Sequence, residues 1–153
     1  TGSNGFDAAW SADDVSYIRG ATSAVLDEFA FADNLAYAIG FSMGGDMTLR
    51  LSCEASDLFS GFGVVGQSGP WATSSGMVGK SWASNCAPSP VARPIIFLSG
   101  TQDYYFSATQ VEDGFHNYAT TVLGCAPSSA TMLCFERKIA AGRGGRAHVA
   151  QLE

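Results

Sequence analysis

The stretch that decides the fold is YAIGFSMGGDMTLRLSCE, residues 37–54, where a serine stands among glycines between two regular segments. Residues 35–39, LAYAI, form a short, nearly uncharged run, which is typical of a strand buried on both faces of a parallel sheet. Residues 43–54 are predicted to form a helix. Because glycine is unfavourable inside strands and helices, the glycines beside the serine indicate a turn with unusual backbone geometry.

The rest of the chain alternates strands and helices in the same way. Ser11 and Asp14 form a capping-box-like start of a helix, whose apolar residues recur at helical spacing on one face: Val15, Ile18, Val25, Leu26 and Phe29. We expect buried strands at 62–66 and 93–100, a helix at 107–123, a last strand at 148–152 and a long irregular segment at 67–94. Apolar strands that alternate with helices predict an α/β fold with a parallel, doubly wound sheet.

The composition indicates one globular domain with a sizeable core. The chain has 153 residues, of which 46% are hydrophobic and 14% are charged, and its net charge of −6 argues against a nucleic-acid or anionic-membrane partner. Four basic residues gather among glycines, and we interpret them as a solvated loop rather than an RNA-binding segment: Arg137, Lys138, Arg143 and Arg146. No run approaches the ~20 apolar residues of a membrane span.

The four cysteines show no CxxC spacing and no paired histidines, so neither a zinc site nor another metal or cofactor is predicted. An even number of cysteines suits a secreted protein with two disulfides. Buried free thiols are the alternative.

Residues Gly40 to Gly44 match the pattern G-x-S-x-G between a predicted strand and a predicted helix. In this context the pattern indicates a nucleophile elbow, a tight turn that holds the serine in a strained conformation. We expect Gly40 and Gly44 to lack side chains because neighbouring backbone passes close by. Ser42 is then the candidate nucleophile, and the N–H of Met43 is a candidate oxyanion donor at the helix N-terminus.

The glycines have two alternative interpretations. One is a glycine-rich strand–helix turn without chemistry, and the other is a phosphate-binding loop. The P-loop pattern requires a lysine that this stretch lacks, and the G-x-G-x-x-G pattern of dinucleotide-binding proteins is absent as well.

A serine nucleophile of this type needs an acid and a histidine, which follow it in the chain. Asp103 is the candidate acid because it follows a buried strand and a glycine turn, although it could instead cap the next helix. Asp46 and Asp57 lie on or just past the nucleophile's own helix and are worse placed.

The chain has two histidines, and neither is a good candidate for the base. His116 lies in the middle of a predicted helix, and His148 lies at the start of the last strand, at the wrong end. The triad histidine is expected in the loop after that strand, whereas the sequence ends at Glu153.

Four segments carry a family resemblance: DDVSYIRG (13–20), the nucleophile segment 35–69, CAPSPVARPIIFLSGTQDYYF (86–106) and GRGGRAHVAQLE (142–153). They resemble the secreted carbohydrate-esterase and polyhydroxybutyrate-depolymerase-like branch of the α/β-hydrolases, which includes feruloyl esterases. The resemblance implies that Ser42 is the nucleophile and Asp103 the acid, and it puts His148 at a strand position that is not catalytic.

The resemblance also implies that residues 1–153 form a single, partial α/β-hydrolase catalytic domain. The family's early strands, which supply the second oxyanion donor, would precede Thr1, and its catalytic histidine loop would follow Glu153. It further implies that Cys53 pairs with Cys86, and that Cys125 pairs with Cys134 or with a cysteine outside the sequence.

The implied function is a secreted, serine-dependent carboxylic ester hydrolase. Its substrate would be an extracellular acyl ester or polyester of the feruloyl, acetyl-xylan or polyhydroxybutyrate type, either small or polymeric. A peptidase or acyltransferase of the same fold and a non-catalytic, hydrolase-like binding domain are the alternatives. Four aromatic residues either wall the cleft or serve ordinary packing: Trp71, Trp82, Tyr104 and Tyr105.

Overall fold

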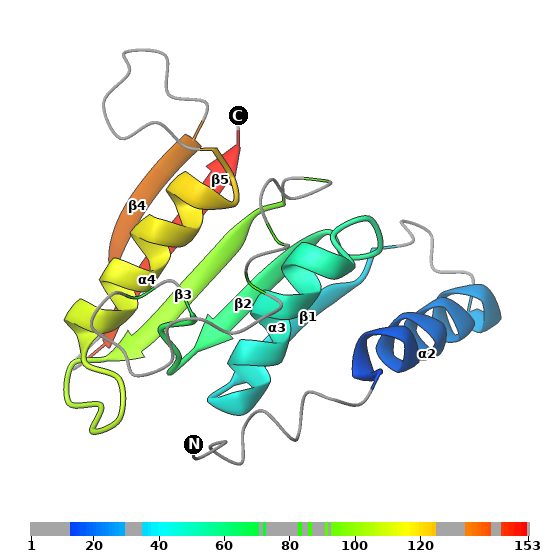
Figure 1. Ribbon diagram of the computed structural model, residues 1–153, viewed down its shortest axis with the longest axis horizontal. Helices are drawn as coiled ribbons and strands as arrows, with labels where there is room; N and C mark the ends of the chain where they lie inside the picture. The colour runs from blue at the N-terminus through cyan, green and yellow to red at the C-terminus, as the bar shows by residue number, and fades with distance from the viewer. Residues whose placement is uncertain are drawn as a thin grey trace.

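The computed structural model describes residues 13–29, 35–70, 93–124, 134–141 and 145–152, together with the single residues 72, 83, 86 and 91. Its elements are α2 (Asp14–Phe29), β1 (Tyr37–Phe41), α3 (Met43–Glu54), β2 (Gly61–Val65), β3 (Ile95–Gly100), α4 (Ala108–Thr121), β4 (Cys134–Ala141) and β5 (Gly145–Leu152) (Figure 1). The expected helices and strands are present near their predicted positions, and β4 is an additional strand.

The sheet has the strand order β1-β2-β3-β5-β4 and is mixed rather than fully parallel. β1, β2 and β3 are parallel, whereas β5 is antiparallel to both β3 and β4. Only three residues separate the end of β4 from the start of β5, and so short a connection permits only an antiparallel pair. The solvated loop expected for the basic residues is therefore wrong, because Arg137 and Lys138 lie in β4 and Arg146 lies in β5.

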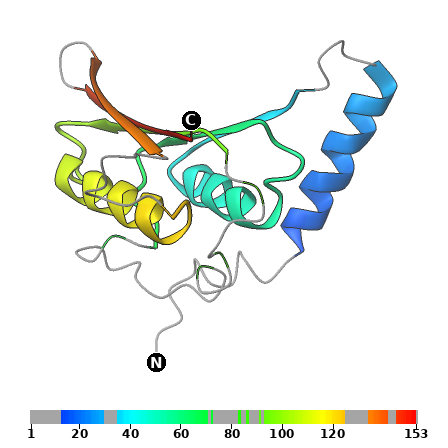
Figure 2. The same ribbon diagram turned by 90° about the horizontal axis from the view of Figure 1, so that it is seen from above.

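Both helices that pack on the sheet cover the same face. Figure 2 shows α3 and α4 side by side below the strands, with α2 beyond the edge formed by β1. On the opposite face Tyr37, Ile39 and Phe41 of β1 are 62%, 76% and 72% exposed. The described chain thus forms one helical layer on a sheet, and neither the doubly wound arrangement nor the burial of residues 35–39 on both faces is found.

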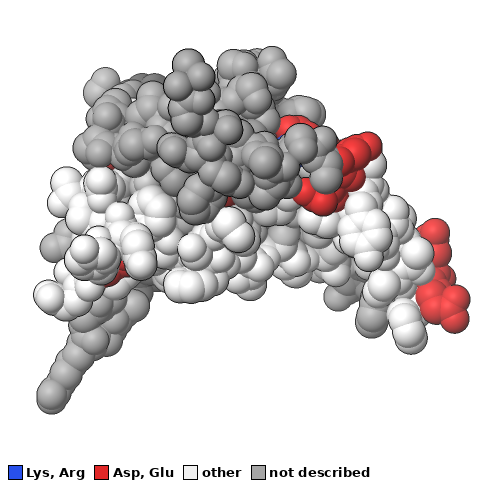
Figure 3. All heavy atoms as spheres, turned by 60° about the horizontal axis from the view of Figure 1, so that its bottom comes forward, with Lys and Arg blue, Asp and Glu red and all other residues white. Residues whose placement is uncertain are grey.

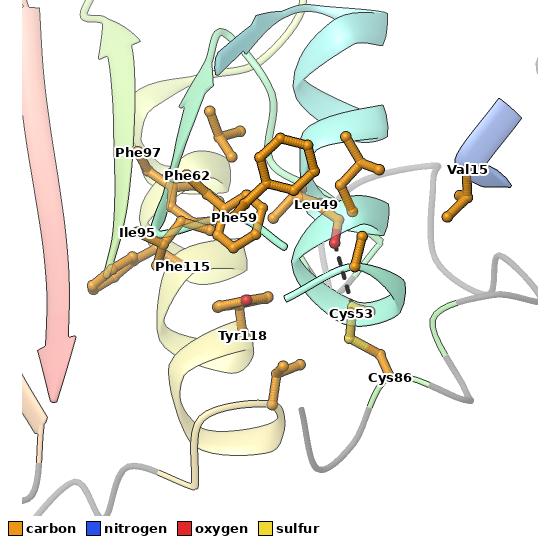
Figure 4. Packing of buried hydrophobic residues seen from close by; sticks show 14 of the residues in the cluster. Val15, Leu49, Cys53, Phe59, Phe62, Cys86, Ile95, Phe97, Phe115 and Tyr118 are labelled. Carbon is orange, nitrogen blue, oxygen red and sulfur yellow. Dashed lines mark hydrogen bonds between the residues drawn. A yellow bond between two sulfur atoms is a disulfide. The ribbon is translucent and has the colours of Figure 1, made fainter. Parts of the chain in front are cut away.

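The core fills the space between the sheet and its single helical layer (Figure 4). Leu49 of α3 and Phe97 of β3 are fully buried, and the rings of Phe97 and Phe115 from α4 pack in a T-shaped arrangement with 5.5 Å between the centroids. The hydroxyl of buried Tyr118 donates to Ser52 Oγ at 2.8 Å and so joins α4 to α3. A chain of aromatic and polar contacts therefore holds the two helices in a fixed relation to the strands.

A disulfide joins Cys53, near the end of α3, to Cys86, with 4.9 Å between the Cα atoms (Figure 4). This confirms the pairing implied by the family resemblance. Cys125 lies outside the described residues, and Cys134 is described only as the start of the β4 backbone, so the second pairing stays a prediction.

The helix α2 is attached more loosely than its apolar pattern predicts. Val15 is buried, but Val25 and Phe29 are 49% and 65% exposed. Asp13 accepts a hydrogen bond from the N–H of Ser16 at the start of the helix, whereas the expected cap, Ser11, lies outside the described residues. The guanidinium of Arg19 donates two hydrogen bonds to the carboxylate of Asp57, each 2.6 Å long, which lowers the pKa of Asp57.

Replacing both Cys53 and Cys86 by alanine should lower the free energy of unfolding by about 3–4 kcal/mol, because the bridge links two residues 33 positions apart and so restricts the unfolded chain. Urea unfolding of the double variant, compared with the oxidised and the reduced wild type, measures the difference. Equal midpoints for all three proteins would contradict the prediction.

Tyr118 should make the stability fall at alkaline pH. Burial raises the pKa of Tyr118 to about 12, so between pH ~10 and ~12 the unfolded chain loses this proton while the folded chain keeps it. We expect a loss of roughly 2–3 kcal/mol over this window in the wild type that is absent in Tyr118→Phe. Tyr17→Phe, at a tyrosine that is 76% exposed, is the matched control and should behave as the wild type in urea unfolding.

Candidate functional site

Ser42 is the single residue between the end of β1 and the start of α3, as the motif predicts. Its backbone angles are φ 53° and ψ −117°, and among the described residues it is the one non-glycine with positive φ. Such a conformation costs on the order of 1–3 kcal/mol and persists only where the surrounding structure enforces it. The strand–turn–helix context is therefore confirmed, together with a strained serine at its centre.

The backbone of Ser42 is held in this conformation mainly by contacts with β2 and with the residues that follow β2. The N–H of Ser42 donates to the carbonyl of Val65, the last residue of β2, at 2.9 Å. The carbonyl of Ser42 accepts the N–H of Asp46 at 3.2 Å and faces the side-chain Nε2 of Gln67 at 3.5 Å. Both polar groups of the strained residue are thus anchored.

Two glycines make room for this turn, but they are not both the expected ones. A Cβ on Gly40 would collide with the backbone of Gly44 and would lie 2.7 Å from the nitrogen of Gly45. A Cβ on Gly45 would lie 3.1 Å from Cβ of Gln67, whereas one on Gly44 would meet no atom within 4 Å. The prediction that neighbouring atoms leave no room for a side chain is confirmed for Gly40 and wrong for Gly44. Gly45, not Gly44, is the second glycine that lies close to neighbouring atoms.

The hydroxyl of Ser42 is not used to cap α3. Serine at the N-cap usually accepts a hydrogen bond from a first-turn N–H, but Ser42 makes no side-chain cap. The N–H groups of the first three helical residues, Met43, Gly44 and Gly45, have no carbonyl acceptor within the helix. The half-buried residue Ser42 and the N–H of Met43 therefore both lie at the positive end of a 12-residue helix.

Asp103 lies in the loop after β3 with its carboxylate held by the backbone. Its Oδ1 accepts the N–H groups of Tyr105 and Phe106 at 2.8 and 2.9 Å. Its Oδ2 lies 3.5 Å from the position that a Cβ on Gly66 would occupy, next to the end of β2. Asp103 does not cap α4, because Ser107 does so in a capping box with Gln110. One carboxylate oxygen is thus fixed by its loop, and the other points toward the neighbouring strand.

Ser42 and Asp103 lie at the same edge of the sheet. They follow the carboxyl ends of β1 and β3, which are parallel and have β2 between them. Two strand spacings amount to about 9.5 Å. An imidazole with a hydrogen bond at each end spans roughly 8 Å, so the spacing of the two strands suits a histidine between the serine and the acid.

Neither histidine of the chain lies at this edge in the described structure. His116 lies within α4, with Nε2 3.9 Å from Oε1 of Glu112. His148 lies inside β5, and its backbone is paired with that of Phe97. Because β5 is antiparallel to β3, its carboxyl end is at the opposite edge, so a histidine directly after β5 would start far from Ser42. This direction differs from the parallel last strand that the expected histidine loop requires.

The two carboxylates that the sequence ranked below Asp103 lie in α3 or are paired with another residue, whereas two of the four aromatic residues lie beside Asp103. Asp46 is buried in the first turn of α3, and Asp57 is engaged with Arg19. Tyr104 and Tyr105, directly after Asp103, are 91% and 81% exposed and contact each other edge to face at 5.3 Å. Ordinary packing does not account for these two tyrosines. Trp71 and Trp82 lie outside the described residues.

The described surface carries its acidic side chains unevenly. Figure 3 shows acidic side chains gathered toward the side on which α2 lies, while much of the other described surface in that view is uncharged. Within the described residues no group of three or more His, Cys, Asp or Glu is placed to hold a metal ion. None of the described helices has the length and apolar character needed to cross a bilayer.

Comparison with family models, curated proteins and solved structures found no match.

The two outer glycines of the motif should differ sharply in their tolerance of a side chain. Gly40→Ala puts a methyl group into the backbone of Gly44, so we expect a loss of roughly 3 kcal/mol or more in unfolding free energy, or no folding. Gly44→Ala meets no atom and should raise helix stability by up to about 1 kcal/mol. Urea unfolding of the pair measures both, and equal effects would contradict this account of the turn.

Proposed function

We propose that this chain carries the nucleophile and the acid of a serine-dependent carboxylic ester hydrolase with an α/β-hydrolase fold. The observation that supports it most is Ser42 at the N-terminus of α3. Its backbone is strained, and its hydroxyl makes no capping hydrogen bond to the helix. A serine at a helix N-cap without a capping role needs another reason for its geometry. Attack on an acyl carbon is the chemistry that a strained strand–helix serine serves.

In the proposed reaction, Ser42 Oγ attacks the carbonyl carbon of an ester while a histidine takes its proton. The N–H of Met43 would donate to the oxyanion of the tetrahedral intermediate. The intermediate expels the alcohol, which takes the proton from the histidine, and leaves an acyl group on Ser42. Water then attacks with the histidine as base and releases the carboxylic acid. Asp103 would hold the histidine through Oδ2, since Oδ1 is occupied by Tyr105 and Phe106.

The histidine and the second oxyanion donor belong to the proposal but not to the described site. His116 and His148 lie elsewhere in the fold. The base would therefore come from polypeptide other than residues 1–153, through a segment that reaches the gap between Ser42 and Asp103. The non-catalytic binding domain is the second candidate, because this same gap holds neither histidine.

The substrate class rests on the surroundings of the site and on the family resemblance. The disulfide between Cys53 and Cys86 is compatible with an extracellular protein, which favours an extracellular acyl ester or polyester. Tyr104 and Tyr105 offer exposed aromatic faces beside Asp103 that suit an aromatic or polymeric substrate. Peptidases and acyltransferases share the same acylation step, so hydrolysis of an ester has to be measured directly.

Covalent labelling of Ser42 tests the proposal. We expect the 153-residue chain to turn over a short-chain nitrophenyl ester near the background rate, since it lacks a placed base. Exogenous imidazole should accelerate acylation, and peptide mapping should find the acyl group on Ser42. Asp103→Asn should lower the imidazole-stimulated rate by roughly tenfold or more, if the acid orients the added base.

The controls separate this reaction from background acylation. Ser42→Ala should abolish the imidazole-stimulated component, whereas Ser23→Ala, at an exposed serine of α2, should leave it intact. Equal labelling in Ser42→Ala and the wild type, or no labelling of Ser42 under any condition, would reject the esterase proposal and favour the binding domain.

A further inference from the structure

The side chain of Gln67 is buried directly beneath the turn that contains Ser42. It is 2% exposed, and it follows β2 by two residues. Its Oε1 accepts the N–H groups of Ser68 and Gly69 at 2.9 and 3.2 Å. Two backbone donors at one end of the amide require that end to be the oxygen, so the NH₂ end must face the other way.

The NH₂ end of this amide faces the strained serine. Nε2 of Gln67 makes a long, weak contact with the carbonyl oxygen of Ser42 at 3.5 Å, beyond the ~2.7–3.2 Å typical of an N–H···O hydrogen bond. The amide has little freedom to turn away, because its oxygen is held by the N–H groups of Ser68 and Gly69. The turn passes close by as well, since a Cβ on Gly45 would lie 3.1 Å from Cβ of Gln67. Gln67 therefore presents a donor to Ser42 from a fixed position.

The Ser42 carbonyl and the Met43 N–H belong to the same peptide group. A peptide group is planar, and its C=O and N–H point in opposite directions, so the direction of one sets the direction of the other. The orientation of this peptide group is set by the backbone angles of Ser42, which are strained at φ 53° and ψ −117°. A donor that holds the Ser42 carbonyl therefore also aims the N–H of Met43.

We propose that Gln67 is a positioning residue that aims the Met43 N–H at the site by holding the Ser42 carbonyl. Its effect on catalysis rests on the proposed function, whereas its effect on the turn does not. Asp46 shares the carbonyl through its own N–H at 3.2 Å. Loss of the Gln67 donor should thus loosen the peptide plane without unfolding α3.

Gln67→Glu separates the two ends of the amide. The oxygen that serves Ser68 and Gly69 is kept, while the donor to Ser42 is replaced by an acceptor that repels the carbonyl. Gln67→Met is a second variant of similar size without charge, in case a buried carboxylate prevents folding. Gln110→Glu makes the same chemical change in the capping box of α4 and is the matched control.

The first measurement is amide hydrogen exchange, which does not depend on activity. In both Gln67 variants the N–H of Asp46 should exchange roughly three- to tenfold faster, as expected for one weakened hydrogen bond. The N–H of Ala55, bonded to Leu51 at the other end of α3, should keep its rate, and so should both amides in Gln110→Glu. Unchanged exchange at Asp46, or equal acceleration at both ends of the helix, would overturn the proposal.

The second measurement is the imidazole-stimulated acylation of Ser42. Loss of the aimed N–H should lower the maximal rate by roughly three- to tenfold and leave the ester concentration at half-maximal rate unchanged, because the oxyanion forms only in the transition state. A change in that concentration alone would also overturn the proposal. If the wild type shows no labelling of Ser42, the proposed function fails, and the exchange rates still decide the role of Gln67 in the turn.

Discussion

The candidate site depends on one hydrogen bond, from the N–H of Ser42 to the carbonyl of Val65. A non-glycine residue at φ 53° relaxes unless its neighbours prevent it, and this bond ties the strained residue to β2. Unlike β1, which is an edge strand of the sheet, β2 is bonded on both sides, to β1 and to β3. It also has helix α3 packed against it and is almost wholly buried. The serine is thus anchored to a strand that cannot shift without disrupting the parallel part of the sheet.

The same strand also sets the place of the acid. Gly66, directly after β2, donates its N–H to the carbonyl of Leu98 in β3 at 2.9 Å, and Oδ2 of the Asp103 carboxylate lies next to Gly66. Ser42 and Asp103 follow β1 and β3, yet both are positioned against the end of β2. This explains how two short loops can hold a defined separation: each is attached at one end to its own strand and contacts the central strand beside it.

The features that could be predicted from the sequence are those set by short-range backbone constraints. The turn at Ser42 follows from glycines next to it in the chain, and Asp103 follows from a buried strand with a glycine at its end. The direction of β5 could not be predicted, because it depends on pairing across the sheet, and the charges of Glu136, Arg137 and Lys138 conceal β4. The role of Gln67 depends on a contact with a residue 25 positions away, for which no local signal exists.

The direction of β5 also limits how a base could complete the proposed site. Gly100, Gly145 and Ala141 lie in register across β3, β5 and β4, so the near ends of the antiparallel pair meet the edge that carries Asp103. On that side of Asp103 the ends of β5 and β4 already occupy the edge of the sheet. The gap toward Ser42 lies above the end of β2, where Gly66 carries no side chain and Oδ2 of Asp103 is turned toward it. A histidine that bridges the two residues therefore has to enter over β2. There the ring of Phe41 already lies 3.0 Å from the position that a Cβ on Gly66 would occupy, so the imidazole would have to lie beside that ring.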